Sequence, residues 1–285
     1  MNRMRQKCRG QRRVAWTAGL LICVVIATPA CEQFEEPELD LERLYGYTSA
    51  PLAVLLSAAW VNGRVNYPLI ARDYAEYIDR FVELCAEDGP NSQPNVYFET
   101  RHRAAYYVNV HNGLILQTWM KHGAASGDTD LRFDPAWLDE QIHSVDGEMV
   151  SIREVAELAM QQGYQFMPFA LASGTVTGPP VPASPLDAET FDRALDRQVR
   201  LFFADARTIG RVPDPDGIGQ TFYAPPVLAE HGERFGSLEA LLDLYIPEGY
   251  PYKLDLLRAA HEQTLRFREP SDRINLPDAV LEPLP

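Results

Sequence analysis

The stretch that decides the fold is RAAYYVNVHNGLILQTWM, Arg103–Met120, the longest mostly apolar run outside the N-terminus. On a helix, Asn109, Asn112 and Leu116 share one face, because their spacing is i, i+3 and i+7. Apolar residues cover most of the remaining helix surface, which is typical of a helix buried in a core. We therefore expect a central buried helix at about residues 101–120, with two asparagines inside it.

Two buried asparagines need hydrogen-bond partners, because each unsatisfied amide costs about 1–3 kcal/mol. In a structural interpretation, Asn109 and Asn112, with Tyr106 on the same helix, form a polar network that holds the backbone of neighbouring loops. In a functional interpretation, the same side chains line a binding site. We favour the structural interpretation, since buried polar networks more often support a fold than carry chemistry.

The composition indicates one acidic globular body. The chain has 285 residues, 46% of them hydrophobic and 23% charged, which suits one domain of moderate size. Its formal charge is −14, and the first thirty residues contain six basic residues and no acidic one. The rest therefore holds 20 basic and 40 acidic residues. Such a body will not bind nucleic acid by charge, so we expect no nucleic-acid partner.

The N-terminus has the three parts of a secretory signal. Basic residues extend to Arg13, an apolar run follows at Trp16–Ala27, and small residues precede Cys31. The apolar run is too short to indicate a membrane span. A cysteine after a small residue is similar to a bacterial lipobox, although Thr28 stands where such motifs have an apolar residue. We expect a signal peptide at residues 1–30.

Cys31 is then the predicted lipidation site, and residues 31–45 form an acidic tether. Two or more acyl chains give stable membrane anchoring. The predicted location is the bacterial cell envelope, with the exported protein anchored to a membrane through Cys31. Two alternatives stay open: cleavage that leaves Cys31 without lipid, and a signal retained as an uncleaved anchor.

Cysteine usage agrees with export. Cys8 and Cys23 leave with the signal, so Cys85 is the one cysteine of the body besides the predicted anchor. A single remaining cysteine makes no internal disulfide, so the fold must rest on its core. Cys85 lies in the apolar stripe of a predicted helix and is interpreted as a small buried hydrophobic residue.

The rest of the pattern predicts an α+β fold: a mainly helical single domain with a few short strands or a small hairpin sheet. Helices are expected at about residues 41–60, 73–85, 101–120, 152–161, 186–204, 234–245 and 254–267. Phe166–Ser173 is predicted as a short buried strand or run, and Val145-Asp146-Gly147 as a hairpin turn. A second hairpin is expected between 211–212 and 220–223. Residues 46–250 form the domain, and 251–285 a C-terminal helix and Pro-rich tail.

Six segments in a fixed order carry a family resemblance. They are NGRVNYPLI (62–70), AAYYVNVHNGL (104–114), VSIREVAELA (150–159), MPFALASGTVTGPP (167–180), LDAETFDRALDRQVRLFFAD (186–205) and GQTFYAPPVL with ERFGS (219–237). Together they resemble the domain of unknown function 547 family over about residues 55–250. The ordered set, rather than any one motif, is what makes the resemblance specific.

The resemblance implies a site that is only partly present here. Asn109 and Asn112 match the family's paired asparagines, and His111 stands where the family has Tyr. Pro168 falls at the family's His position and Ser173 at its Cys position. A family with His, Cys and acidic residues is similar to thiol hydrolases of papain-like or transglutaminase-like fold, an analogy of fold alone. This chain would then have lost both the nucleophile and its base.

The acidic position of the family also differs. Ala156 falls where the family's Glu is expected, and Glu157 where a His is expected. A shift of one residue would put Glu157 in the acidic role. Asn66 similarly stands where the family has Asp. The chain therefore resembles a degenerate member of the family.

A rearranged catalytic triad of Ser173, His111 and Glu157 is the catalytic alternative. The structural interpretation of His111 is a hydrogen-bonded core histidine, which is the commoner case. No phosphate-binding, dinucleotide-binding or kinase glycine pattern occurs, and no pair of histidines has metal-ligand spacing. We therefore expect neither a cofactor nor a metal.

Three functions fit these features. The first is a membrane-anchored envelope protein whose domain binds a small ligand or another envelope protein without chemistry. The second is a hydrolase or acyl-transfer enzyme with a rearranged Ser/His/Glu site. The third is a purely structural envelope component. We favour the first function, because the positions where a nucleophile and its base are expected hold Ser173 and Pro168 instead of Cys and His.

Overall fold

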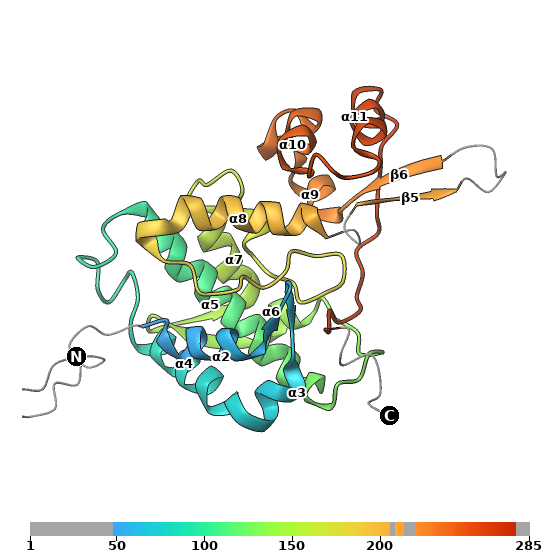
Figure 1. Ribbon diagram of the computed structural model, residues 1–285. Coiled ribbons are helices and arrows are strands. Elements are labelled where there is room, and N and C mark those ends of the chain that lie inside the picture. The colour runs from blue at the N-terminus through green and yellow to red at the C-terminus, as the bar shows by residue number, and fades with distance from the viewer. Residues whose placement is uncertain (1–47, 206–208, 214–219, 278–285) are drawn as a thin grey trace, which may run out of the picture. The chain divides into compact units, whose positions relative to one another are not determined.

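The computed structural model describes residues 48–205, 209–213 and 220–277 (Figure 1). The predicted signal peptide, the tether and the lipidation site Cys31 lie outside the described residues. The observed architecture is α+β and mainly helical with small sheets, as the sequence predicts. All described residues fall within one compact unit of the chain.

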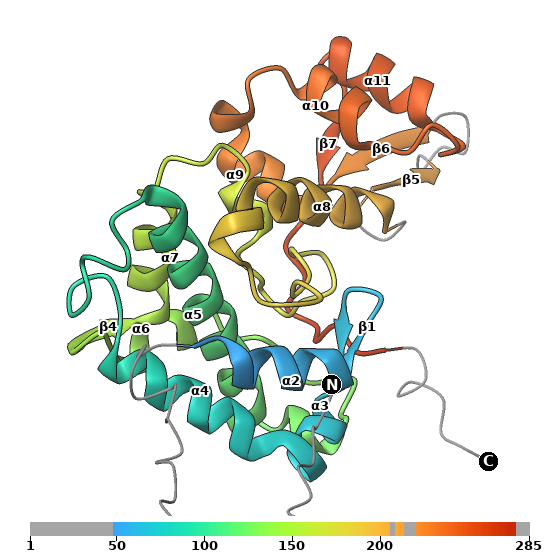
Figure 2. The ribbon, with the colours of Figure 1, turned by 60° about the vertical axis from the view of Figure 1, so that its left-hand side comes forward.

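The predicted central helix is α5, Thr100–Lys121. Every residue of Ala104–Trp119 is buried, because other elements surround this helix. Helices α4 (Ala75–Glu87) and α7 (Ile152–Met160) pack directly on α5, and α2 (Ala50–Ala59) packs on α4 (Figure 2). The first core cluster therefore forms around α5.

Helix α4 approaches α5 closely at Gly113. A Cβ atom built on Gly113 would meet the ring of Phe81 at well under 3.0 Å, closer than real Cβ atoms come. Phe81 is fully buried. A glycine inside a helix costs about 1 kcal/mol relative to alanine, so Gly113 is explained by this contact rather than by helix propensity.

Two hairpins lie beside the helices. β1 (Trp60–Val61) pairs with β2 (Arg64–Val65), and β3 (Ile142–Val145) pairs with β4 (Glu148–Ser151). The turn between β3 and β4 is at the predicted Asp146-Gly147, both with positive φ. The predicted reciprocal cap of α7 is also present: the Ser151 hydroxyl accepts from the Glu154 N–H, and the Glu154 carboxylate accepts from the Ser151 N–H.

A second core cluster follows in the chain. Its elements are α8 (Phe191–Ala204), β5 (Gly210–Pro213), β6 (Gln220–Ala224), α9 (Pro226–Phe235), α10 (Leu238–Tyr245), α11 (Lys253–His261) and β7 (Arg266–Phe267). β5 and β6 form the predicted antiparallel hairpin, and β7 adds to β6 in parallel. The remaining short elements are α3 (Tyr67–Leu69), a π-helical turn (Ile70–Tyr74), α6 (Trp137–Glu140) and three 3-10 turns (Ala124–Ser126, Met167–Phe169, Ala188–Thr190).

Phe166–Ser173 is a buried run but not a strand. Met167–Phe169 form a 3-10 turn, and the backbone after it bonds to α5 rather than to a neighbouring strand. Pro168 has no N–H to donate, and its φ suits the first turn of a helix. The proline therefore decides against the strand.

The two C-terminal helices also differ from the prediction. The expected helix at 234–245 is divided between α9 and α10, because Gly236 has a φ of +70° and Ser237 caps α10. The helix expected to reach Phe267 ends at His261, where Gln263 takes a φ of +57°. Arg266 and Phe267 then pair with β6, a partner distant in sequence.

The chain returns to the first core cluster after β7 (Figures 1 and 2). Single bridges join Arg273 to Arg132 and Ile274 to Thr175. The Asn275 N–H donates to the Gly174 carbonyl oxygen at 2.9 Å. Ile274 and Leu276 are both buried in the first cluster. Residues 270–276, which we call the C-terminal segment, therefore connect the two clusters.

Candidate functional site

Asn109 joins α5 to the loop before α8. Its Nδ2 donates to the Leu186 carbonyl oxygen at 2.8 Å, and its Oδ1 accepts from the Leu186 N–H at 2.7 Å. The side chain is buried. Both atoms of the amide are thus occupied by one backbone unit, which fixes the loop to the central helix.

Asn112 makes the same kind of contact one helical turn later. Its Nδ2 donates to the Ala170 carbonyl oxygen at 2.9 Å, and its Oδ1 accepts from the Ala172 N–H at 2.9 Å. These bonds place the segment after the 3-10 turn against α5. His111 Nδ1 lies 3.1 Å from the same Oδ1. The asparagine therefore orients the imidazole as well as the loop.

His111 is buried as a neutral imidazole. Burial lowers the pKa of His111 from 6.5 to about 4, and the hydrogen bond to Asn112 opposes this only in part. The ring is therefore uncharged at pH 7. It can accept a hydrogen bond from a ligand, but it offers no positive charge.

Ser173 is fixed within its own loop. Its Oγ accepts from the Thr175 N–H at 3.1 Å and lies 2.8 Å from the Thr175 Oγ1. Its carbonyl oxygen accepts from the Trp119 Nε1–H of α5 at 3.1 Å. A Cβ on Gly178 would meet Ser173 Oγ at well under 3.0 Å, so any larger residue there would displace the Ser173 side chain. The hydroxyl shapes the loop and makes no bond to His111 among the described residues.

His111 and Ser173 nevertheless line one cavity of about 520 Å³. Its walls come from α5, α7, α9, the loop at 171–179 and the C-terminal segment. Most lining side chains are apolar, among them Ile115, Phe133, Leu138, Leu171 and Val227. Five prolines also line it: Pro135, Pro168, Pro179, Pro226 and Pro270. Size and lining are typical of a small-molecule site.

The other predicted site residues lie elsewhere. Glu157 is exposed and is not one of the residues that line this cavity. Tyr106 is buried, and its hydroxyl donates to the Cys85 carbonyl oxygen at 3.1 Å, which ties α5 to α4. Burial raises the pKa of the Cys85 thiol well above its usual value, so Cys85 is an unreactive core residue. The structure thus brings together two of the three residues of the catalytic alternative.

The cavity also gathers Ala156, Pro168 and Ser173, which were considered from the sequence as acidic, histidine and cysteine positions. All three line the cavity, although they come from α7, a 3-10 turn and a loop. The neighbouring Glu157 points away, because consecutive helical residues are about 100° apart.

Three charged or titratable residues that line the cavity were not among the site residues predicted from the sequence. They are Arg153, Glu230 and His231. Arg153 is largely exposed and binds the Asp139 carboxylate through Nε at 2.6 Å and Nη2 at 3.0 Å. The Asp139 hydrogen bond raises the pKa of Arg153. Partial burial lowers the pKa of His231. No local sequence motif identifies these residues as site residues, because α7 and α9 are distant in sequence and reach the same cavity only in the folded chain.

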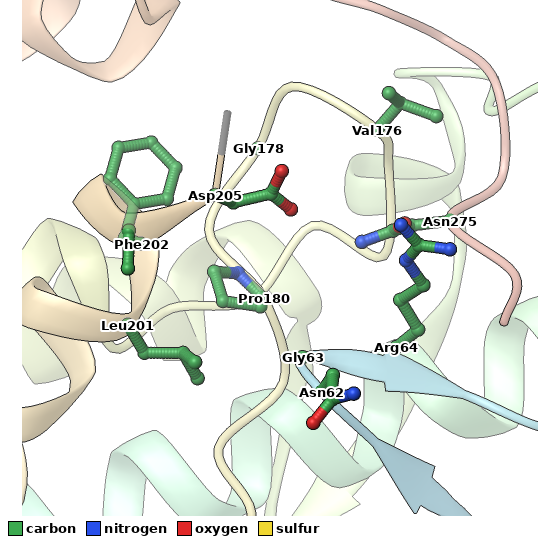
Figure 3. A pocket seen from close by; sticks show the side chains of 11 residues that line it. Asn62, Gly63, Arg64, Val176, Gly178, Pro180, Leu201, Phe202, Asp205 and Asn275 are labelled. Atoms are coloured by element: carbon green, nitrogen blue, oxygen red, sulfur yellow. The ribbon is translucent and has the colours of Figure 1, made fainter. Parts of the chain in front are cut away.

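A second cavity, of about 300 Å³, is lined in part by the same loop (Figure 3). Val176 and Pro180 line the second cavity, residues 173, 175, 177 and 179 line the first, and Gly178 lines both. Arg64 and Asp205 also line the second cavity, and Arg64 Nη1 lies 3.5 Å from the Leu276 carbonyl oxygen.

Within the described ranges, no group of three or more His, Cys, Asp or Glu side chains is placed to hold a metal ion. None of the described helices has the length and apolarity needed to cross a bilayer. Comparison with known proteins finds no family model that matches the chain. It also finds no similar curated protein and no similar solved structure at a significant level.

Proposed function

We propose that this chain is a non-catalytic binding protein of the bacterial cell envelope, exported and anchored through Cys31. Its domain takes up a small, mainly apolar ligand in the 520 Å³ cavity. The observation that carries this proposal is the lining: apolar side chains surround a buried, neutral His111. Pockets of about 300–1,000 Å³ with few polar groups commonly bind small molecules.

Rigidity of the walls supports binding. Proline fixes φ, so the five prolines restrict the backbone at five points around the cavity. Asn112 and Trp119 further fix the loop that forms one wall. A preformed site loses little conformational entropy when the ligand enters.

The residues at the family-matched positions support binding without chemistry. Ala156 and Pro168 have no acid–base group. Ser173 is held by Thr175, and an activated serine needs an adjacent base. The chain thus resembles a hydrolase-like domain that keeps its cavity and lacks its reactive groups.

Filling the cavity tests the proposal. We expect saturable fluorescence enhancement when 1-anilinonaphthalene is titrated into the full chain. Ala156→Phe should weaken the binding by about tenfold or more, equivalent to about 1.4 kcal/mol, because the added ring occupies the cavity. Ala75→Phe, at an exposed position of α4, is the control and should bind as the parent does. Equal binding by the parent and both variants would contradict the proposal.

Hydrolysis is the second candidate, because His111 and Ser173 line the same cavity. It predicts turnover of a p-nitrophenyl ester that falls by about 100-fold or more in Ser173→Ala, the effect of removing a nucleophile. The binding proposal predicts no turnover above the uncatalysed rate. Turnover that depends on both Ser173 and His111 would favour the enzyme.

A further inference from the structure

The amide of Asn112 has one orientation. Its Nδ2 faces the Ala170 carbonyl oxygen, and its Oδ1 faces the Ala172 N–H. Reversing the amide would place N–H against N–H and oxygen against oxygen. The backbone therefore determines which Asn112 atom meets His111, and that atom is the acceptor Oδ1.

The orientation of Asn112 determines the tautomer of His111. Because Oδ1 accepts, Nδ1 at 3.1 Å must carry the proton and donate. In a neutral imidazole the other nitrogen, Nε2, then has a lone pair and no hydrogen. Nε2 has no partner among the described residues, and protein does not fully enclose it. Since His111 lines the cavity, Nε2 is an acceptor available to a ligand.

The hydroxyl groups nearby already make hydrogen bonds, which use part of their capacity. Ser173 and Thr175 bond to each other. Thr177 Oγ1 accepts from the Ser271 N–H at 2.7 Å. His111 Nε2 differs from these hydroxyl groups because, in this tautomer, it can only accept a hydrogen bond. The ion-paired Arg153 and the exposed Glu230 are open to water, where charge recognition is weak.

We propose that the ligand carries a neutral O–H or N–H donor on an apolar body and donates it to His111 Nε2. Alcohols, phenols and amides fit this description. A carboxylate or phosphate ester anion does not, because it would direct an oxygen lone pair at the Nε2 lone pair. The inference rests on the proposed binding function and names its ligand class.

Three probes of one shape test the ligand class: 2-naphthol, 2-methoxynaphthalene and 2-naphthoate. Binding to the full chain is measured at pH 7 by calorimetry. We expect 2-naphthol to bind about tenfold tighter than 2-methoxynaphthalene, the effect of one buried hydrogen bond, and 2-naphthoate to bind most weakly. His111→Leu should remove the preference for naphthol over its methyl ether. A thermal melt confirms that the variant is folded.

The outcomes separate the two proposals. If all three probes bind the parent with equal affinity, or if 2-naphthoate binds best, the donor rule is wrong and the binding function stands. If no probe binds, both proposals are wrong. The ranking in the parent is decisive even where His111→Leu does not fold, because it needs no variant.

Discussion

Burying a neutral imidazole links stability to pH. The pKa of His111 is about 4 in the fold, against 6.5 for an unperturbed histidine. Between these values the unfolded chain binds more protons than the folded one, so the free energy of unfolding falls as pH falls. This loss of stability is absent above about pH 7 and becomes complete only below pH 4, where both states are protonated. For His111 it amounts to about 2 kcal/mol between pH 7 and pH 5.

Urea unfolding at pH 7 and pH 5 measures this effect. His111→Gln should lose less stability between the two pH values than the parent, because glutamine does not titrate. A part of the slope should remain, since burial also lowers the pKa of His143 to about 4. The control is His261→Gln, which removes an exposed imidazole. The same pH dependence in the parent and His111→Gln would show that His111 is not buried as described.

At the scale of elements, the contact of α4 with α5 predicts that alanine at position 113 is less stable than glycine, the opposite of what helix propensity predicts. Alanine is normally better than glycine in a helix by about 1 kcal/mol. At Gly113, however, the added methyl group overlaps the buried ring of Phe81, and overpacking of this kind costs about 1–3 kcal/mol. We expect Gly113→Ala to lower the free energy of unfolding in a urea titration.

Gly232 provides the matched control in α9. A Cβ there meets nothing within 4 Å, so Gly232→Ala should be neutral or stabilising. The double variant Gly113→Ala, Phe81→Leu should lose less stability than the sum of its two single variants. Strict additivity would mean that the two residues do not compete for one space.

Sequence patterns predict elements best where a local signal is complete. The apolar run of α5 and the Ser151–Glu154 cap of α7 are such signals, and the elements lie where they indicate. At Phe166–Ser173, predicted as a short buried strand or run, the buried run is present, and its Pro168 lies in a 3-10 turn. The helix expected to reach Phe267 is present but ends at His261, because β7 pairs with a strand some forty residues earlier.

In the candidate site, too, local sequence signals predict some features, and contacts between distant segments determine the others. That Asn109 and Asn112 need backbone partners can be read from the sequence, since buried amides must be satisfied. Which loops supply those partners cannot, because Leu186 and Ala170 are brought to α5 only by the fold. Likewise, Ala156 lines the cavity and Glu157 does not, a difference of one residue that the family resemblance left open.

At the scale of the whole molecule, the C-terminal segment joins the two core clusters and forms part of the cavity wall. Its backbone holds the loop at 173–180 through three bonds: Ser271 N–H to Thr177 Oγ1, the Val176 N–H to the Arg273 carbonyl oxygen, and Asn275 N–H to the Gly174 carbonyl oxygen. Pro270 and Ser271 line the cavity itself. Stability and ligand binding should therefore depend together on these few residues.

Two truncations test that dependence. A chain that ends at Pro270 loses the burial of Ile274 and Leu276. Each buried aliphatic side chain contributes about 1.5–3 kcal/mol, so the free energy of unfolding should fall by at least about 3 kcal/mol. Binding of 1-anilinonaphthalene should weaken as well, because the loop wall loses its hydrogen bonds. A chain that ends at Pro277 keeps all of these contacts and should match the parent in both measurements. If the two truncated chains behave alike, the C-terminal segment neither stabilises the clusters nor shapes the cavity.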